Sequence, residues 1–556
     1  MIQKKKDQQK RYFFLFALFF LLIKLFLMKD VTIYAITTAF ADDQLMVHIA
    51  EKLLRLNWLG GYNHYTLAKG FFFPFFLAVG KVLHIDYISW VQIFYAIACY
   101  LFVKAISPVI RFRWMLYVFY LLLLFHPIMA SSEVIQRVYR NSITPAQVLL
   151  VFGGQFGFYL RYRCDKKLSL KWALVTSFGF ISLWFSREDA VWVVPFLAGS
   201  SAIVFLLTLK SGLFHAVTNK KRISYAIILL LPFLALPACR FPISILNGIV
   251  YDSWTDNELN HGAFSQVMKD LYAINMEEPA PYTSISREKI KKVYEISPTL
   301  SSIQDSLESV MDLYAAQSGR IEQNKKDGNV ENGWFFWALR DAVQLEGYYT
   351  DGKTANKFYQ AVSKELETAF ENGQLKRQAT MPSALMPPWQ SGMFPDLLKT
   401  IAKADYYVSS ETELFLLDRI AVDDKSDGIA RFEWITGRNA VRSSPSSNFS
   451  YQFFNALSEL FRKSSLTISA IGKICFLIFA FLFFVKKATQ NAATLLMLTG
   501  IAGGLLCLYA GVAYNELRSC SSIAYMYLCG AYPLSQAFSI LAIIAIIQTI
   551  LERYKV

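Results

Sequence analysis

Two adjacent carboxylates, Asp42 and Asp43, come after the first apolar run of the chain, residues 12–28. Acidic side chains beside a membrane span are costly near lipid, so they are kept where they face water or a functional cavity. There, an ionised carboxylate can take the proton of a hydroxyl group as a general base. The simpler structural explanation is that the pair caps a short interfacial helix, since Asp suits a helix start.

Positive side chains also stand near apolar segments. Lys69 precedes an aromatic segment, and the loop before residue 145 carries Arg137 and Arg140 with Tyr139 between them. The planar guanidinium fork matches phosphate oxygens, so these residues are candidates for binding a phosphate. A helix held by salt bridges to Glu133 would explain the two arginines equally well.

Two further charged groups flank apolar runs. Arg187, Glu188 and Asp189 directly precede the run that begins at residue 190, where Asp189 could simply be the helix N-cap. Glu516 and Arg518 end a later run. If the runs cross a membrane, all four groups converge on one face. Carboxylates that accept a proton, beside cations that hold a phosphate, are suited to moving a group from a lipid phosphate onto a nucleophile.

The composition indicates an integral membrane protein. Of 556 residues, 54% are hydrophobic and only 18% are charged, which is typical of a membrane chain. Residues 247–463 hold 30 acidic and 23 basic residues, which leaves 12 acidic and 33 basic residues elsewhere. Such an excess of Lys and Arg around spans indicates cytoplasmic loops and anionic lipid headgroups, not nucleic acid. None of the seven cysteines lies in residues 247–463, so no disulfide framework is expected there.

The predicted fold is an all-α polytopic membrane protein with about ten to eleven transmembrane helices. Ten of them cover residues 12–28, 88–107, 114–130, 145–160, 170–185, 190–209, 223–246, 466–484, 492–514 and 522–551. Residues 71–84 are too short to cross and are expected to be re-entrant or interfacial. The basic loops and both termini then lie in the cytoplasm, and residues 247–463 lie outside the cell membrane.

Three domains follow from this topology. Residues 1–246 form a membrane module that includes the first outer loop, residues 29–87. Residues 247–463 form a soluble, mainly helical extracytoplasmic insert, because apolar residues recur there three or four apart. Residues 464–556 form the C-terminal membrane helices. The aromatic cluster at 334–337 is expected in the core of the insert, although Tyr348 and Tyr349 could instead stack on a sugar.

The chain lacks the sequence motifs of several common kinds of active site. It has no phosphate-binding loop, nucleophile elbow, HExxH or CxxC pattern. The six histidines are dispersed, and His48 with Glu51 is too small a set for a metal site. No cofactor and no metal ligand are therefore predicted, and a divalent metal is left open.

The first outer loop resembles that of the GT-C fold glycosyltransferases, especially the protein O-mannosyltransferase and aminoarabinose transferase branch. The resemblance is carried, in family order, by Asp42-Asp43, Ile49-Ala50-Glu51, Trp58-Leu59 and Lys69-Gly70. Near the C-terminus, YLCGAYPL from Tyr527 to Leu534 is similar to a late-span pattern of the family. Met526 stands where the family often has Arg, a role that would pass to Arg518.

The resemblance implies a GT-C-like fold and a sugar transfer from a polyprenyl-phosphate donor to a glycan, lipid or protein acceptor at the outer face of the cell membrane. Asp42 would be the catalytic base and Asp43 its neighbour at the acceptor. The implied donor-phosphate residues are Lys69, Arg137, Tyr139 and Arg140. Residues that would contact the acceptor or support the site are His64, Arg187, Glu188, Asp189 and Arg518.

Two other functions compete with this interpretation. A transporter or flippase of lipid-linked glycans would place its charges on broken helices near mid-membrane, whereas here they gather at one interface. A non-catalytic scaffold would use the insert to bind a cell-wall polymer and would need no base at Asp42.

Overall fold

The computed structural model describes residues 2–162, 166–210, 219–318, 321–423, 427–441, 448–486 and 492–553. Within these ranges the chain is helical, and its only β-type pairings are isolated bridges between single residues. This confirms the predicted all-α class. Helices suit a chain of this hydropathy because they satisfy the backbone donors and acceptors internally, as lipid requires.

Six helices in the described part of the chain are long and apolar enough to cross a membrane. These stretches are Tyr87–Val109, Ala190–Lys210, Tyr225–Tyr251, Phe449–Val485, Ala492–Arg518 and Ala531–Leu551. They belong to α4 (Tyr87–Ile106), α8 (Val194–Lys210), α9 (Asn219–Tyr251), α19 (Phe449–Lys486), α20 (Ala492–Arg518) and α22 (Ala531–Arg553). All six coincide with predicted spans, so the chain has the helices expected of a membrane protein.

The four other predicted spans fall on α1 (Ile2–Leu27), α5 (Arg113–Leu124), α6 (Thr144–Tyr159) and α7 (Lys166–Trp184). At 12 and 16 residues, α5 and α6 rise only about 18 and 24 Å, less than a hydrocarbon core of about 30 Å. Every residue of α6 from 144 to 158 is buried, so its hydropathy reflects a core helix, not a lipid-facing one. A count of ten to eleven spans stays a prediction. The aromatic segment forms α3 (Phe72–Val82), as short as expected.

The predicted insert divides into two parts. Residues 252–393, called the insert domain below, carry α10 (Gly262–Ala273), α11 (Arg287–Ile296), α12 (Pro298–Ser301), α13 (Gln304–Ser318), α14 (Glu322–Lys326), α15 (Asn332–Leu345) and α16 (Gly352–Glu371) around a core of their own. By contrast, α17 (Phe394–Ser410) and α18 (Gly428–Thr436) contribute Val408 and Phe432 to the core of the bundle. An amphipathic pattern shows that a helix buries one face but does not show against what.

The aromatic cluster of α15 is only partly in the core. Phe335 and Trp337 are buried, whereas Trp334 is 42% exposed. Tyr349 is also buried, and its hydroxyl lies 2.9 Å from that of Tyr359. Its ring is therefore not free to stack on a sugar.

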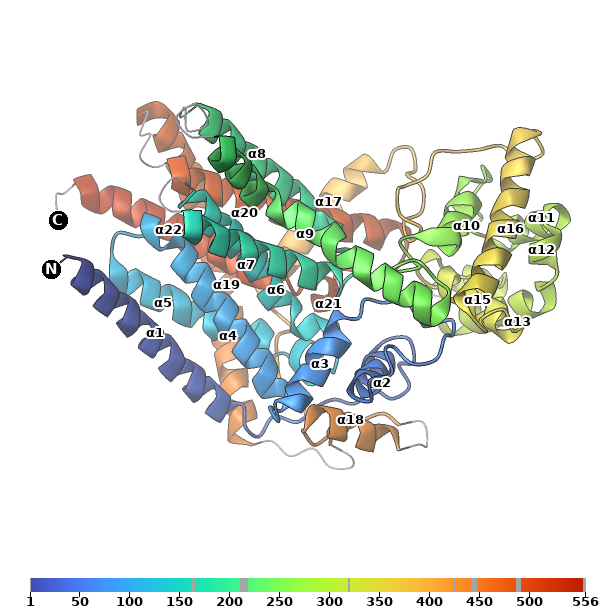
Figure 1. Ribbon diagram of the computed structural model, residues 1–556, viewed down its shortest axis with the longest axis horizontal. Coiled ribbons are helices and arrows are strands. Elements are labelled where there is room, and N and C mark those ends of the chain that lie inside the picture. Colours follow the sequence, from blue (N-terminus) through green and yellow to red (C-terminus); the bar gives the residue numbers. More distant parts are fainter. Residues whose placement is uncertain are drawn as a thin grey trace.

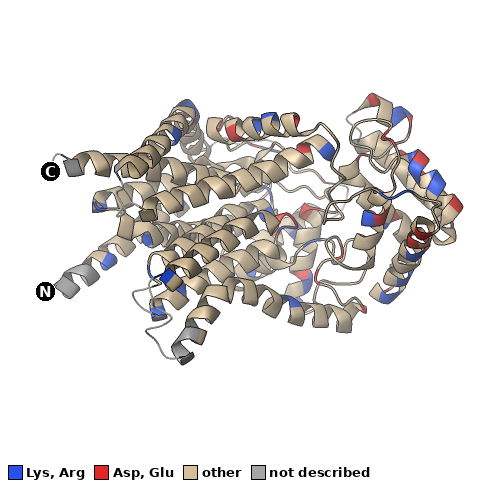
Figure 2. Cartoon of the chain, turned by 90° about the horizontal axis from the view of Figure 1, so that it is seen from above, with Lys and Arg blue, Asp and Glu red and all other residues tan. Residues whose placement is uncertain are grey.

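Both termini lie at one end of the long axis, and α10, α11, α12, α13, α15 and α16 lie at the other (Figure 1). Charged side chains are sparse along the helices near the termini and frequent in the opposite half (Figure 2). This polarity suits apolar helices that cross a bilayer and carry a polar domain at one end.

The segment between α1 and α2 (Asp43–Leu54) is held by distant parts of the chain. Isolated parallel bridges join Ile33 to Ala440, Tyr34 to Arg137 and Ile36 to Val422. The amide of Tyr34 also donates to the carbonyl of Gln136 at 2.9 Å. These pairings bring the start of α2, and with it Asp42 and Asp43, beside the loop that carries the arginines.

Candidate functional site

The two adjacent carboxylates lie in different environments. Asp42 occupies the N-cap position of α2, but its side chain makes no capping hydrogen bond and is 37% exposed. The side chain of Asp43 is fully buried. Consecutive side chains diverge at a helix start, so one carboxylate faces the open site and the other faces the core. Helix capping, the simpler explanation of the pair, does not describe what Asp42 does.

Asp43 forms a forked ion pair with Arg137. The Nε of Arg137 lies 2.9 and 3.0 Å from the two carboxylate oxygens, and its Nη2 lies 2.7 Å from Oδ2. Burial raises the pKa of Asp43 to about 6, against the opposing effect of Arg137. The same Nη2 lies 3.6 Å from Asp42, so Arg137 bridges both carboxylates.

Asp42 is bound by Lys69 and Tyr139. The Nζ of Lys69 donates to Oδ1 of Asp42 and also, at 2.9 Å, to the hydroxyl of Tyr139. That hydroxyl donates to the same Oδ1 at 3.0 Å. Burial alone would raise the pKa of Asp42, but the charge of Lys69, with that of Arg137, outweighs it and holds this pKa well below its usual range.

Lys69 reaches this position because Gly70 lets the loop approach the end of α7. A Cβ atom at Gly70 would lie 2.0 Å from the carbonyl oxygen of Phe185, so no other residue fits without moving backbone. The amide of Phe72 donates to that same carbonyl at 3.0 Å. The Lys-Gly pair is thus explained by close backbone packing.

Three cations surround the ring of Tyr139. The Nζ of Lys69, the Cζ of Arg137 and the Cζ of Arg140 lie 5.2, 5.1 and 5.2 Å from the ring centroid. Cations within about 6 Å of an aromatic face are attracted to it. The structure therefore brings together all four residues that the sequence proposes for phosphate binding.

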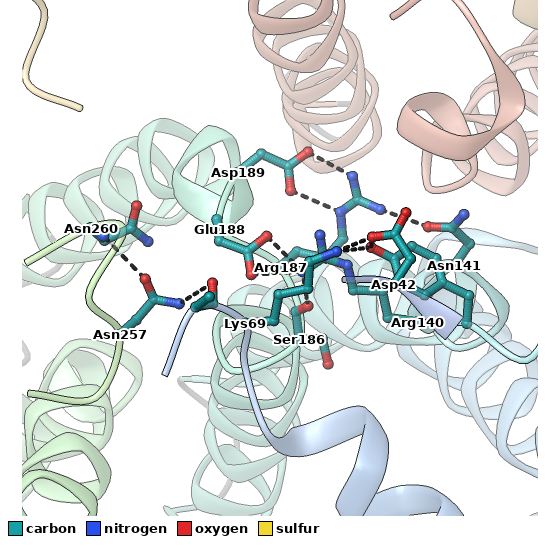
Figure 3. Close-up of polar contacts among 12 residues, drawn as sticks. Asp42, Lys69, Arg140, Asn141, Ser186, Arg187, Glu188, Asp189, Asn257 and Asn260 are labelled. Carbon is teal, nitrogen blue, oxygen red and sulfur yellow. Dashed lines mark hydrogen bonds and ion pairs between the residues drawn. The ribbon is translucent and has the colours of Figure 1, made fainter. Parts of the chain in front are cut away.

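Two more arginines, Arg140 and Arg187, lie near Lys69 (Figure 3). The Nη1 of Arg140 lies 2.7 and 2.6 Å from the oxygens of Glu188, while its Nε is buried with no hydrogen-bond partner among the described residues. Arg187 forks onto Asp189, with both distances 2.8 Å, and reaches Asn141 at 3.0 Å. Each cation of the site is thus paired with a carboxylate, so an incoming phosphate must compete for it.

Salt bridges to Glu133, the alternative explanation for Arg137 and Arg140, are present only in part. Glu133 lies 3.7 Å from Arg137 and is also bound by Arg419. The shorter contacts of Arg137 and Arg140 are to Asp43 and Glu188. These join separate segments of the chain, so the arginines do more than stabilise their own turn.

His64 and Arg518 do not join the cluster around Tyr139 and contact residues of the insert domain instead. His64 Nε2 is 3.3 Å from Asp341 of the insert domain. Arg518 is buried and binds Glu278 at 2.6 Å, so it connects α20 to the insert domain. The arginine beside Met526 is Arg187, whose Nη1 donates to the Met526 carbonyl at 3.3 Å.

Trp337 also lies beside the site, although the sequence predicts it only as a core residue of the insert. The Nζ of Lys69 lies 5.8 Å from its ring centroid. Trp337 and Lys69 are far apart in the sequence, and no local pattern connects them. Among the described residues, no group of three His, Cys, Asp or Glu side chains is arranged to hold a metal ion.

An apolar groove of about 250 Å³ lies among α6, α8 and α20. Its lining includes Phe156, Phe196, Gly199, Gly503 and Gly504. A Cβ atom at Gly199 or Gly503 would meet nothing within 4 Å, so these glycines leave open space beside the helices.

Comparisons of this chain with protein families, with characterised proteins and with solved structures find no match.

Proposed function

We propose that the protein is a membrane glycosyltransferase of the GT-C type. It would transfer a sugar from a polyprenyl-phosphate donor to a hydroxyl group of a cell-envelope glycan, lipid or protein at the outer face of the cell membrane. The observation that carries the proposal is the cluster around Tyr139, where a partly exposed carboxylate, Asp42, meets Lys69, Arg137 and Arg140. The resemblance of the first outer loop to the GT-C family points to the same chemistry.

Asp42 is assigned the role of general base because it is the accessible carboxylate of the pair. Its side chain is 37% exposed, whereas that of Asp43 is fully buried and held by Arg137. A base must come within hydrogen-bond reach of the hydroxyl that it deprotonates. Asp43 instead orients Arg137 and so supports the cationic side of the site.

Lys69 would change partners during the reaction. While it is bound to Asp42, the pKa of that carboxylate is too low for an effective base. The donor phosphate is a phosphodiester with one negative charge, which would compete with Asp42 for Lys69, and it gains a second negative charge as the sugar is transferred and the polyprenyl phosphate leaves. The loss of that neighbouring cation raises the pKa of Asp42, so donor binding would itself activate the base.

The transfer balances with the groups in the cluster. The acceptor oxygen forms a bond to the anomeric carbon as the bond from that carbon to the phosphate oxygen breaks. Asp42 takes the acceptor proton, and the polyprenyl phosphate leaves with the electron pair. Lys69, Arg137 and Arg140 would stabilise the charge that builds up on the leaving phosphate.

The surroundings of the cluster support a lipid-linked donor. The site lies where the apolar helices meet the insert domain, since Lys69 approaches Trp337. The apolar groove begins near Pro195, six residues after Asp189, and would accommodate part of a hydrocarbon chain. A transporter would need its charges near the middle of the helices.

Two measurements test the proposal together. Mass spectrometry of a deletion strain should show a polyprenyl-phosphate sugar that accumulates, and the purified protein should release polyprenyl phosphate from that lipid in proteoliposomes. Asp42→Asn should fail to restore either signal while it is present in the membrane at the normal level. Full restoration by Asp42→Asn, or no lipid-linked sugar that accumulates, would reject the enzyme.

A further inference from the structure

The insert domain binds the backbone of the loop that carries Lys69. Four carbonyl oxygens just before Lys69 accept hydrogen bonds from it. The pairs are Arg340 Nε to His64 at 2.6 Å, Arg340 Nη2 to Thr66 at 3.2 Å, the Glu258 amide to Leu67 at 2.9 Å and Asn257 Nδ2 to Ala68 at 3.3 Å. Ala68 is itself part of the apolar core of the insert domain. The loop is therefore fixed on one side by a domain far away in the sequence.

One face of α15 supplies two of these four hydrogen bonds, both from Arg340, together with further side-chain contacts to the loop. Trp337, Arg340, Asp341 and Gln344 are spaced three or four apart, the spacing that puts side chains on one helix face. Trp337 covers the Lys69 ammonium group. Asp341 and Gln344 both contact His64, each at 3.3 Å.

Arg340 is the centre of this face. It is fully buried, is paired with Glu258 at 3.0 Å and lies over the rings of Phe264 and Tyr349 at 5.0 and 5.1 Å. Glu258 in turn accepts a hydrogen bond from Tyr62 at 2.6 Å, so the network returns to the same loop. A buried charge needs several well-placed partners, and here two of those partners are backbone carbonyls of the loop. The observed geometry of the loop gives partners to Nε and Nη2 of Arg340, while Nη1 is buried without a hydrogen-bond partner among the described residues.

We propose that Arg340 is a positioning residue for Lys69, and that the insert domain is part of the reaction site and not a separate binding module. By holding carbonyls on the residues before Lys69, Arg340 fixes the backbone from which the lysine reaches either Asp42 or a donor phosphate. The lysine can then change partners by side-chain rotation alone. The part of this inference that concerns phosphate rests on the proposed function; the positioning of Lys69 does not.

The test compares Arg340→Lys with Arg287→Lys in the full-length protein. Arg287 is also an arginine of the insert domain, paired with Glu308 and Asp312, and it does not contact the Lys69 loop. Lys keeps the positive charge, but its donors share one nitrogen atom and cannot reproduce the fork with which Nε and Nη2 of Arg340 reach the two carbonyls and Glu258. Lys69 is only 8% exposed, so its rate of acylation, measured residue by residue with mass spectrometry, reports whether the loop is held.

We expect acylation of Lys69 to rise at least tenfold in Arg340→Lys and to stay unchanged in Arg287→Lys. Asn257→Ala removes the bond to Ala68 and the bond that Asn257 accepts from the Asn260 amide within the insert domain. It should give a smaller rise and serves as the second variant if Arg340→Lys does not fold. Unchanged Lys69 acylation in the folded variants overturns the inference.

A second measurement separates this inference from the proposed function. Binding of polyprenyl phosphate, the leaving group itself, should weaken about tenfold in Arg340→Lys and stay normal in Arg287→Lys. Faster Lys69 acylation without any loss of polyprenyl phosphate binding would retain the positioning role and reject the contact between Lys69 and phosphate.

Discussion

Lys69 and Asp42 form an ion pair across 27 residues of sequence, and the lysine also donates to Tyr139 at 2.9 Å. In this arrangement the side chain proposed to bind phosphate neutralises the side chain proposed to act as base. Each group is therefore held inactive by the other. A ligand that competes for Lys69 has a direct effect on the basicity of Asp42.

Replacement of Asp42 by Asn should separate catalysis from binding. Asn keeps the size of the side chain but cannot accept the acceptor proton, so turnover should fall about 10²–10⁴-fold. Because Lys69 loses its charged partner, polyprenyl phosphate should bind more tightly. Turnover and lipid binding can be measured on the same purified sample. Weaker lipid binding by the folded variant would contradict the exchange of partners at Lys69.

The pH dependence of the reaction should reflect Asp43. Because burial raises its pKa to about 6, Asp43 takes up a proton as the pH falls through about 6, while Asp42 stays ionised. Arg137 then loses its main partner and turns toward Asp42, which lowers the basicity of that carboxylate. The plot of kcat/KM against pH should fall on the acid side of about pH 6, and Asp43→Asn should remove this step.

The carboxyl group of Asp43 should also make the stability of the protein depend on pH. Between about pH 4 and pH 6 the folded protein binds a proton at Asp43 that the unfolded chain has already lost. The free energy of unfolding should therefore fall as the pH rises through this window and then level off above it. Thermal melting in detergent at several pH values measures this slope. Asp43→Asn should make it less steep, and Asp270, whose pKa burial also raises to about 6, would account for a remaining slope.

Arg140 and Glu188 should be tested as a pair. Arg140→Gln alone leaves Glu188 mostly buried without its charged partner, which destabilises the fold. In the double variant Arg140→Gln/Glu188→Gln both partners are neutral, so stability should recover. Charge-assisted contacts are worth about 1.5–3 kcal/mol, so loss of Arg140 should weaken donor binding about tenfold or more even in the stable double variant. Normal donor binding there would exclude Arg140 from the phosphate site.

Hydropathy was sufficient to predict the membrane class, since all six apolar helices of the structure lie on predicted spans. It could not separate a lipid-facing helix from a buried one. For example, α6 is predicted as a span and is buried from residue 144 to residue 158, which hydropathy alone does not show. Residue type and topology placed Asp42, Lys69 and Tyr139 on one face, and they are in contact.

The partners of His64 and Arg518 could not be predicted in the same way. Both bind residues of the insert domain, Asp341 and Glu278, that are far away in the sequence. Periodicity describes each helix by itself, and the position of α15 over the Lys69 loop depends on tertiary packing. The role proposed for Arg340 rests on its hydrogen bonds to backbone carbonyls, which no sequence pattern predicts.

The orientation in the membrane makes a further prediction. The termini and the insert domain lie at opposite ends of the structure (Figure 1), so termini in the cytoplasm would place the insert domain outside. Protease added to intact spheroplasts should cut within residues 247–463 and leave the termini protected. Protection of these residues until lysis would place the site on the cytoplasmic face and reject an extracytoplasmic acceptor.

The apolar groove predicts dependence on the length of the donor lipid. Gly503 lines the groove and has open space where a side chain would start. Gly503→Leu should fill it without a clash. Lipid tails are as apolar as the groove, so what is lost is van der Waals packing and not a hydrophobic driving force. The affinity for a long polyprenyl phosphate should fall modestly, by about threefold to tenfold.

A short prenyl phosphate that carries the same headgroup should bind Gly503→Leu as it binds the unsubstituted protein, because its chain does not reach the groove. Gly511→Leu is the matched control: Gly511 lies on the same helix, also has open space at its Cβ and does not line the groove. Binding of both lipids can be compared in detergent by native mass spectrometry. If Gly503→Leu weakens the short and the long lipid equally, or if Gly511→Leu has the same effect, the hydrocarbon chain does not lie in this groove.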